Sequence, residues 1–440
     1  MFFTLYFINL LTWCTAQRQN FLLIIVDDLR TALGCYGDSK AYTPNIDHLA
    51  KRSAIFSQVF AQQALCAPSR NSFLTSRRPD TLQLYDFYSY WRTDTGNFTT
   101  LPQHLKENGY ITKSIGKVFH PEYHPLHKFE VPNPYKWSEN VSSIAYNPWN
   151  DLRRRNDVEA LNLKFPWEKI PRWSLGEHAI WAKYSNYDVA LRVPLIMSIP
   201  RLTFKQDKEN KRVEVTNQAS ATQSLLNHKQ TDGYSNDVSK CYKKNVFNIV
   251  SVRNSLKNQI IIDSLVELVD VFPTIANLAN CSIPICSDEN TKKENMFIEQ
   301  SNPRVEIVCS EGITLVPLIR AALQKKSLLW KKAAFGQYPR PSIEPSLHPN
   351  SDEPRFKEII AMGYTLKTNK YRYTLWLRFK PEMKVPDWND SIAEELYDHG
   401  DDEGETRNLA TSQTHAGIKN ELKIMLQRGW RNALPGTFTE

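Results

Sequence analysis

Apolar residues are most concentrated near the start of the chain, where residues 21–26 read FLLIIV. A wholly apolar run of this length is typical of a strand that is buried on both faces of a parallel sheet. Two carboxylates, Asp27 and Asp28, follow the run directly. Because ligands gather at the carboxyl ends of strands in open α/β sheets, we expect this pair to lie in a functional site.

Periodicity and end signals predict further helices and strands. Residues 45–52 have helical periodicity after Thr43-Pro44, and residues 101–108 have it up to Gly109, which stops the helix. Order resumes at residues 260–278, where residues 264–269 lead into a short predicted helix. Strands are predicted at residues 364–367 and 371–376. The alternation of strands and helices favours an α/β sandwich.

Composition excludes several classes of protein. Of the 440 residues 41% are apolar and 23% are charged, which is unlike a collagen-like, coiled-coil or wholly disordered chain. The net charge of +8 suits an anionic ligand, but it is spread too thinly to indicate nucleic acid. No apolar segment reaches the ~20 residues of a membrane-spanning helix. Residues 204–258, rich in Lys and Asn, predict a partly disordered insertion.

The N-terminus predicts secretion. Residues 2–13 are apolar or uncharged, and small residues at 14–16 precede the polar Gln17, so residues 1–16 are interpreted as a signal peptide. The alternative is a buried N-terminal strand, since no Lys or Arg precedes the apolar run. A signal peptide leads to the secretory pathway, with a lysosomal or extracellular destination, where disulfides form. Glycosylation sequons begin at Asn97, Asn140, Asn280 and Asn389.

The most specific motif is the segment CAPSR at residues 66–70, followed by LTSR at residues 74–77. It resembles the signature of the sulfatase family, in which the cysteine is converted after translation to formylglycine. The five-residue core is intact, and Ser76 stands where the family usually has Gly. The alternative is that Cys66 is a small buried apolar residue, as free cysteines often are.

The resemblance extends beyond this motif, to the iduronate-2-sulfatase branch of the family. It covers residues 21–200, 260–290 and 330–410, including GKVFHP at 116–121 and WAKYSN at 181–186. It implies an alkaline-phosphatase-like α/β domain at residues 21–330, with a mainly parallel central sheet flanked by helices. A smaller C-terminal α+β subdomain with an antiparallel sheet is implied at residues 331–440.

The resemblance also assigns roles to single residues. Formylglycine at Cys66 would be the nucleophile, and Asp27 and Asp28 would bind one Ca²⁺ together with it. Arg70 would hydrogen-bond to the formylglycine hydrate.

Further roles concern the sulfate group. His120 would assist collapse of the sulfated intermediate, while Lys117 and Lys183 would contact sulfate. A core histidine and a solvated surface lysine are the alternatives for His120 and Lys183. His124 is a candidate sulfate-binding residue, or else part of a Pro-rich surface loop.

Two segments of the family pattern have no counterpart here. The strand and acidic motif that normally precede residues 176–178 (GEH) are missing, so two downstream metal ligands are predicted to be deleted. A strand and a Lys-Pro-His motif are missing after His120. The motif YDHG at residues 397–400 is interpreted as part of the C-terminal tail rather than as a substitute. Loss of a central strand leaves buried backbone groups unpaired, at ~1 to 3 kcal/mol each.

The family's C-terminal cysteine pair implies a disulfide between Cys286 and Cys309, with Cys35 free. The leading functional hypothesis is a sulfuric ester hydrolase that removes 2-O-sulfate from uronic acid residues of heparan or dermatan sulfate, after a formylglycine-generating enzyme has modified Cys66. The second is a weakened or inactive relative, or a truncated isoform, that binds sulfated glycan. A phosphoesterase of the same superfamily would need Ser or Thr at position 66.

Overall fold

The computed structural model describes residues 18–96, 98–114, 117–119, 177–180, 183–204, 259–287, 308–343 and 353–436. The predicted signal peptide, His120, His124 and residues 205–258 of the predicted insertion lie outside these residues. The helices are α1 (Pro44–Ala50), α2 (Cys66–Thr75), α3 (Pro79–Leu82), α4 (Trp91–Asp94), α5 (Leu101–Glu107), α7 (Asp188–Leu191), α9 (Val271–Leu278), α11 (Val316–Leu323) and α12 (Ala416–Arg428).

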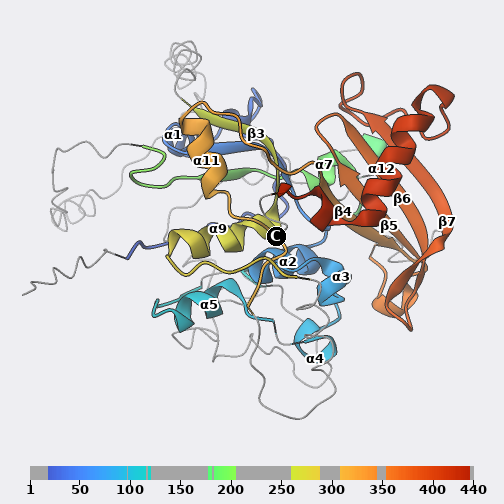
Figure 1. Cartoon of the computed structure of the whole chain (residues 1–440), viewed down its shortest axis with the longest axis horizontal. Coiled ribbons are helices and arrows are strands. Elements are labelled where there is room, and N and C mark those ends of the chain that lie inside the picture. Colours follow the sequence, from blue (N-terminus) through green and yellow to red (C-terminus); the bar gives the residue numbers. More distant parts are fainter. Residues whose placement is uncertain are drawn as a thin grey trace, which may run out of the picture.

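The part of the chain before residue 331 contains a three-stranded mixed sheet. Its central strand, β1 (Ala54–Phe60), pairs antiparallel with β2 (Leu195–Met197) and parallel with β3 (Ile260–Glu267). Buried side chains of β1 and β3 pack against α11, and α9 packs against α5 (Figure 1). Strands and flanking helices together confirm the α/β class.

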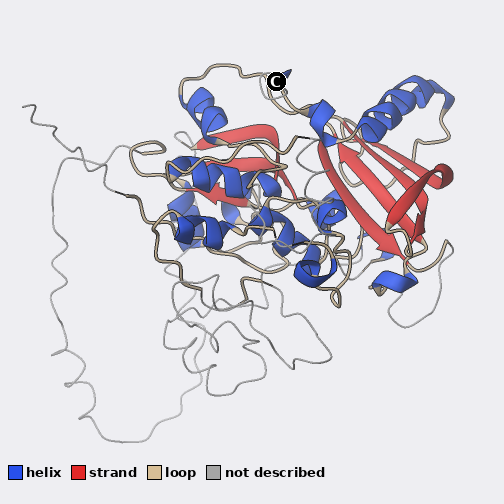
Figure 2. Cartoon of the chain, turned by 60° about the horizontal axis from the view of Figure 1, so that its bottom comes forward, coloured by secondary structure: helices blue, strands red, loops and turns tan. Residues whose placement is uncertain are grey.

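The C-terminal part is a four-stranded antiparallel sheet with one long helix across it. Its strands follow chain order as β4 (Ala334–Arg340), β5 (Ala361–Lys367), β6 (Tyr371–Lys380) and β7 (Val385–Asp398). Leu422 and Leu426 of α12 are buried against this sheet, which lies beside the smaller one (Figure 2). The predicted strands at 364–367 and 371–376 and the predicted antiparallel subdomain are confirmed.

The helices predicted at residues 45–52 and 101–108 are confirmed as α1 and α5, each shorter by one or two residues at its C-terminal end. α1 starts with Pro44 directly after Thr43. In α5 the Thr100 hydroxyl accepts a hydrogen bond from the backbone N–H of Gln103, which satisfies one of the free donors at a helix start. The chain leaves α5 through Gly109 at φ 81°, a left-handed conformation that glycine adopts without strain.

The prediction of a buried strand at residues 21–26 is wrong. The segment pairs with no strand among the described residues, and Leu22 and Ile24 are 86% and 71% exposed. Both edges of β1 are already occupied by β2 and β3, so no ladder with this central strand is open to the run. Asp27 and Asp28 therefore lie in a turn and not at the carboxyl end of a strand.

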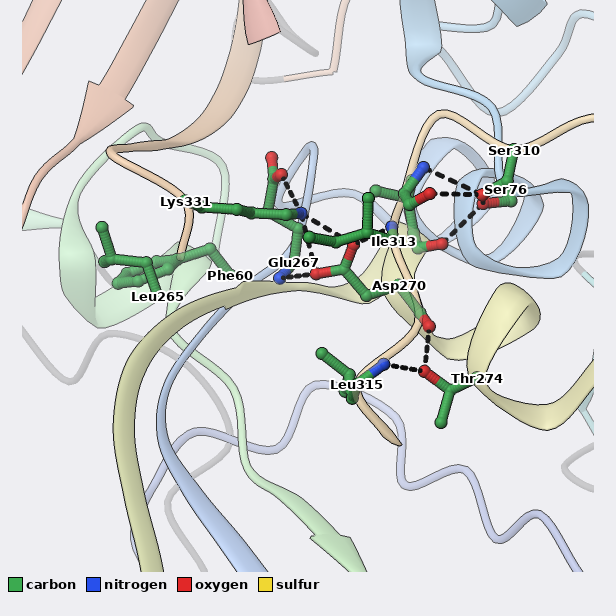
Figure 3. Close-up of polar contacts among 12 residues, drawn as sticks. Phe60, Ser76, Leu265, Glu267, Asp270, Thr274, Ser310, Ile313, Leu315 and Lys331 are labelled. Carbon is green, nitrogen blue, oxygen red and sulfur yellow. Dashed lines mark hydrogen bonds and ion pairs between the residues drawn. The ribbon is translucent and has the colours of Figure 1, made fainter. Parts of the chain in front are cut away.

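Four buried charged residues join the end of β3 to the start of the C-terminal sheet. The Lys331 ammonium lies 2.8 Å from a Glu267 carboxylate oxygen and 2.7 Å from one of Asp270 (Figure 3). Arg78 donates two further bonds to Glu267, at 2.8 and 2.9 Å. Burial alone would raise the pKa of Glu267, but Arg78 and Lys331 outweigh it and lower the pKa to about 2. The charges thus compensate one another inside the core.

Cys286 and Cys309 form a disulfide with their Cα atoms 4.9 Å apart, and Cys35 is a buried free cysteine. This pairing is the one that the family resemblance implied. The bond closes a loop of 23 residues between the segment after α9 and the segment before α11. Cys281 is also free and half-buried, whereas Cys241 lies outside the described residues.

We expect the double replacement Cys286→Ser, Cys309→Ser to lower the free energy of unfolding by about 3 kcal/mol, because a loop of this length loses its constraint in the unfolded chain. Urea unfolding followed by circular dichroism measures the change. Cys281→Ser, which removes a thiol without a crosslink, is the matched control. Equal destabilisation by both variants would contradict the prediction.

Candidate active site

The candidate nucleophile opens the helix α2. Leu65 is extended and Cys66 is the first helical residue, so the side chain of Cys66 stands at the helix N-terminus, where it is 8% exposed. Arg70 follows one turn later on the same helix and is buried. Residues three or four positions apart share a helix face, so the sequence CAPSR directs both side chains to one place.

α2 ends at Ser76, where the family usually has glycine. Ser76 adopts the left-handed conformation, φ 53° and ψ 38°, which explains why glycine is favoured at this position. The serine hydroxyl is buried and donates to the Val269 carbonyl at 2.5 Å, and it lies 2.7 Å from the Ser310 hydroxyl (Figure 3). These bonds hold the serine hydroxyl in one position, and glycine has no side chain that could form them.

The carboxylate pair lies against Cys66. One oxygen of Asp27 is 3.5 Å from the Cys66 Sγ atom, and one oxygen of Asp28 is 3.7 Å from it. Asp28 has φ 57°, so the turn is tight at this position. The three candidate ligand atoms lie within 4.8 Å of one another, although their residues are up to 39 positions apart in the chain.

Three cations surround this cluster. Arg70 donates to Asp27 at 2.6 Å and to the carbonyl oxygens of Lys117 and Val118 at 2.6 and 3.1 Å. The Lys117 ammonium is 2.7 Å from the second oxygen of Asp27.

Lys183 reaches the cluster from its other side. Its ammonium donates to Asp28 and lies 2.8 Å from the Cys66 sulfur. Lys117 lies in a bend at residues 117–119.

The pKa values in the cluster are shifted in opposite directions. Burial raises the pKa of Asp27, but the charges and hydrogen bonds of Arg70 and Lys117 outweigh it and hold this pKa below its usual value. Burial also raises the pKa of the Cys66 thiol; Lys183 opposes this, and the two aspartates add to it. Residue 66 as an unmodified thiol is therefore a poor nucleophile at neutral pH.

The cluster fits Ca²⁺ in donor chemistry but supplies few ligands. Carboxylate oxygens of Asp27 and Asp28 are the hard ligands that Ca²⁺ prefers, and a formylglycine hydrate at position 66 would add another oxygen. Ca²⁺ in proteins takes about 6 to 8 oxygens. No fourth Asp, Glu, His or Cys joins the group in the part of the chain that the structure describes.

The residues that could stand in for the metal ligands predicted to be deleted have other partners. The His178 ring stacks on Tyr187 at 3.7 Å between centroids, and Glu177 pairs with Arg30. Asp398 ends β7 and pairs with Lys370.

The neighbouring His399 is bonded to Glu405, which also accepts from the buried Arg372. His399 and Glu405 thus belong to a separate cluster with Asp188. The motif at 397–400 accordingly serves the C-terminal subdomain.

Sequence reasoning assigned no role to two residues that lie near Lys183. Arg340, the last residue of β4, donates to the carbonyl oxygen of Tyr184 at 2.7 Å. Glu353 is half-buried, and the charge of Lys183 partly offsets the rise that burial causes in its pKa. The signal for Arg340 was present as the segment QYPRP at 337–341, which matches the family without indicating a function.

Comparisons with known proteins agree with the geometry. A family model described as Sulfatase matches residues 19–162. Iduronate 2-sulfatase of Mus musculus is 31% identical, over 92% of this chain and 93% of its own length. The Homo sapiens enzyme is 32% identical, over 87% of this chain and 89% of its own. The mouse alignment extends over 555 positions, so at least 115 of them face a gap in this chain of 440 residues.

Solved structures give more distant matches. One described as a 2-O GAG sulfatase has 17% identity and a TM-score of 0.47, covering 94% of this chain and 92% of its own. One in complex with D-glucosamine-2-N,6-O-disulfate has 15% identity and a TM-score of 0.46, covering 94% and 97%. Among the described residues no helix is long and apolar enough to cross a membrane. With relatives above 30% identity matched along nearly its whole length, this chain belongs to the sulfatase family of sulfuric ester hydrolases.

Proposed function

We propose that the chain hydrolyses the 2-O-sulfate ester of uronic acid residues in glycosaminoglycans such as heparan or dermatan sulfate. The observation that carries the proposal is the convergence of Cys66, the Asp27-Asp28 pair and the two lysines, Lys117 and Lys183, from four separate segments. The substrate class is supported by the two iduronate 2-sulfatases, which match most of the chain.

Residue 66, converted to formylglycine, would attack the sulfur atom through an oxygen of its hydrate, and the sugar alcohol would leave. Ca²⁺, held by Asp27 and Asp28, would supply positive charge to the sulfate oxygens and to the attacking oxygen. Arg70 fixes Asp27 in place, since its guanidinium is buried, with one nitrogen bonded to that carboxylate and the other to the backbone carbonyl of Lys117.

The two lysines would bind the sulfate. Lys183 lies 2.8 Å from the sulfur of Cys66, within reach of an oxygen on the reacting group. Lys117, bonded to the far side of Asp27, provides a second ammonium. Preorganised cations of this kind stabilise negative charge that develops in the transition state. We assign His120 to collapse of the sulfated intermediate and His124 to sulfate contact; both lie outside the described residues.

The proposal includes a partner and a compartment. Formylglycine arises from cysteine by oxidation, so a formylglycine-generating enzyme must act on Cys66. That step would take place in the secretory pathway, with the mature chain acting in the lysosome or outside the cell. The sulfated glycosaminoglycan chain is the partner in catalysis.

Replacement of Asp27 by Asn should weaken Ca²⁺ binding at least about tenfold, because an anionic ligand becomes neutral and Ca²⁺ affinity follows ligand charge. Isothermal titration calorimetry with Ca²⁺ measures the affinity. Asp401→Asn, at an exposed carboxylate of the C-terminal part, removes the same charge elsewhere and should have no effect. Equal Ca²⁺ affinity in the parent chain and the Asp27→Asn variant would exclude Asp27 as a ligand.

Substrate selectivity tests the proposal itself. Sulfate release is compared between 2-O-sulfated iduronate and 6-O-sulfated N-acetylgalactosamine, the substrate type named for relatives that match a third of this chain. We expect release from the uronate and little from the amino sugar. Preference for the 6-O-sulfate would assign the chain to a different sulfatase class.

A further inference from the structure

Arg340 occupies a position next to the candidate sulfate site that the mechanism above does not use. Its Nη2 donates to the carbonyl of Tyr184 at 2.7 Å, and Tyr184 follows Lys183 in the chain. Lys183 in turn lies 2.8 Å from the sulfur of Cys66. Consecutive Cα atoms are about 3.8 Å apart, so the guanidinium is anchored one residue away from the candidate sulfate lysine.

The charge of Arg340 has no carboxylate partner among the described residues. Its hydrogen bonds there go to two backbone carbonyls, those of Tyr184 and, at 3.3 Å, Pro339. Arg70, Lys117 and Lys183 differ in this respect, because each is bonded to Asp27 or Asp28. A guanidinium has five N–H donors, so most of those of Arg340 have no partner in the part of the chain that the structure describes.

The side chain of Arg340 is also held in one orientation. Its guanidinium lies over the rings of Tyr338 and Trp376, at 4.8 and 5.8 Å from their centroids. Tyr338 is fully buried, and the indole N–H of Trp376 is fixed by a 2.6 Å bond to Glu395. The cation is therefore preorganised, so the Arg340 side chain loses little conformational entropy when a ligand binds.

A 2-O-sulfated uronic acid carries two anions on one sugar ring. The sulfate is bound at Lys117 and Lys183 in the proposed function, so the carboxylate needs a separate, neighbouring cation. Arginine matches a carboxylate with two parallel hydrogen bonds, which lysine cannot provide. We infer that Arg340 binds the carboxylate of the sugar whose sulfate lies at Cys66, and so selects uronic acids over neutral sulfated sugars. The inference rests on the proposed function.

The test separates recognition from turnover. In the full-length chain with Cys66→Ala and Ca²⁺ present, calorimetry measures the affinity for two probes. One is the methyl glycoside of 2-O-sulfated iduronic acid, and the other is its carboxyl-reduced counterpart, which keeps the sulfate. We expect the uronate to bind about 10- to 100-fold more tightly, because a charge-assisted pair is lost in the reduced sugar.

Arg340→Gln should remove this preference while leaving the affinity for the reduced sugar unchanged, and Arg340→Lys should retain part of it. Arg378→Gln is the matched control, since Arg378 is an exposed arginine of the same sheet, paired with Asp390. It should keep the full preference.

Three results would overturn the inference. The first is an unchanged preference for the uronate in Arg340→Gln. The second is an equal loss of affinity for both probes in this variant, which would indicate that Arg340 merely supports the Lys183 segment. The third is that neither probe binds to the chain. Sulfate release by the chain with Cys66 intact is measured separately. A chain that discriminates the probes but releases no sulfate would contradict the proposed function and leave the role of Arg340 standing.

Discussion

Cys66→Ala should abolish sulfate release from a fluorogenic iduronate-2-sulfate. The replacement removes the atom from which formylglycine is made, and with it the only nucleophile in the proposed mechanism. Removing the nucleophile of an enzyme that forms a covalent intermediate commonly costs at least about 10³-fold in rate. The assay compares the initial rates of the variant and the parent chain at saturating substrate.

Cys281→Ala is the control for this experiment, because Cys281 is another free cysteine that lies outside the candidate site. It should retain the parent rate. Mass spectrometry of the peptide around residue 66 establishes the fraction converted to formylglycine in the parent. A Cys66→Ala variant that keeps a tenth or more of the parent rate would rule out residue 66 as the nucleophile.

Lys331→Met should produce the largest loss of stability among single replacements. The Lys331 side chain is 1% exposed and bonds to Glu267 and Asp270. Without it Asp270 loses its cation and Glu267 keeps only Arg78, so an uncompensated carboxylate remains in the core. Breaking a buried ion pair by removing one partner costs about 3 to 5 kcal/mol, which urea unfolding measures directly.

Lys332→Met tests whether the effect depends on the network, because the neighbouring Lys332 is exposed. Its change should stay within about 0.5 kcal/mol. The parent chain should also lose stability as the pH falls from about 4.5 towards 2. The pKa of Glu267 is lowered in the folded state, so the folded state binds this proton at a lower pH than the unfolded state does. A loss below about 1 kcal/mol in Lys331→Met would contradict this account of the core.

Local signals were sufficient for much of the fold. The helix at α5 has a capping threonine, a periodic face and a terminal glycine, and all three lie within ten residues of one another. The strands β5 and β6 are joined by a short turn, so alternation and turn residues predict both. Such elements depend mainly on neighbours in sequence.

The apolar run at residues 21–26 shows where local signals fail. Its composition suits a buried strand, but a strand also needs ladder partners, and these come from other parts of the chain. Around β1 both positions are taken by β2 and β3. The bonds of Ser76 and the ion network of Lys331 were likewise unpredictable, because their partners are up to 234 positions away.

The candidate site was predicted through family resemblance and not through spacing. Asp27 is 39 residues from Cys66, and Lys183 is 117 residues from it, so no local pattern connects them. Cys66 and Arg70, by contrast, lie one turn apart on α2, so their relation is local. Arg340 was missed because its place beside Tyr184 depends on how the C-terminal sheet packs.

The central claim is that this chain has a sulfatase site with part of the family's metal ligands. The measurement that tests it is kcat/KM for iduronate-2-sulfate, compared with mouse iduronate 2-sulfatase at equal formylglycine content and saturating Ca²⁺. Loss of a preorganised electrostatic partner costs ~10² to 10³ in rate, so we expect sulfate release at least about 100-fold slower than that of the mouse enzyme. Equal rates would contradict the claim, because the two carboxylates and residue 66 could not then be the whole set of ligands.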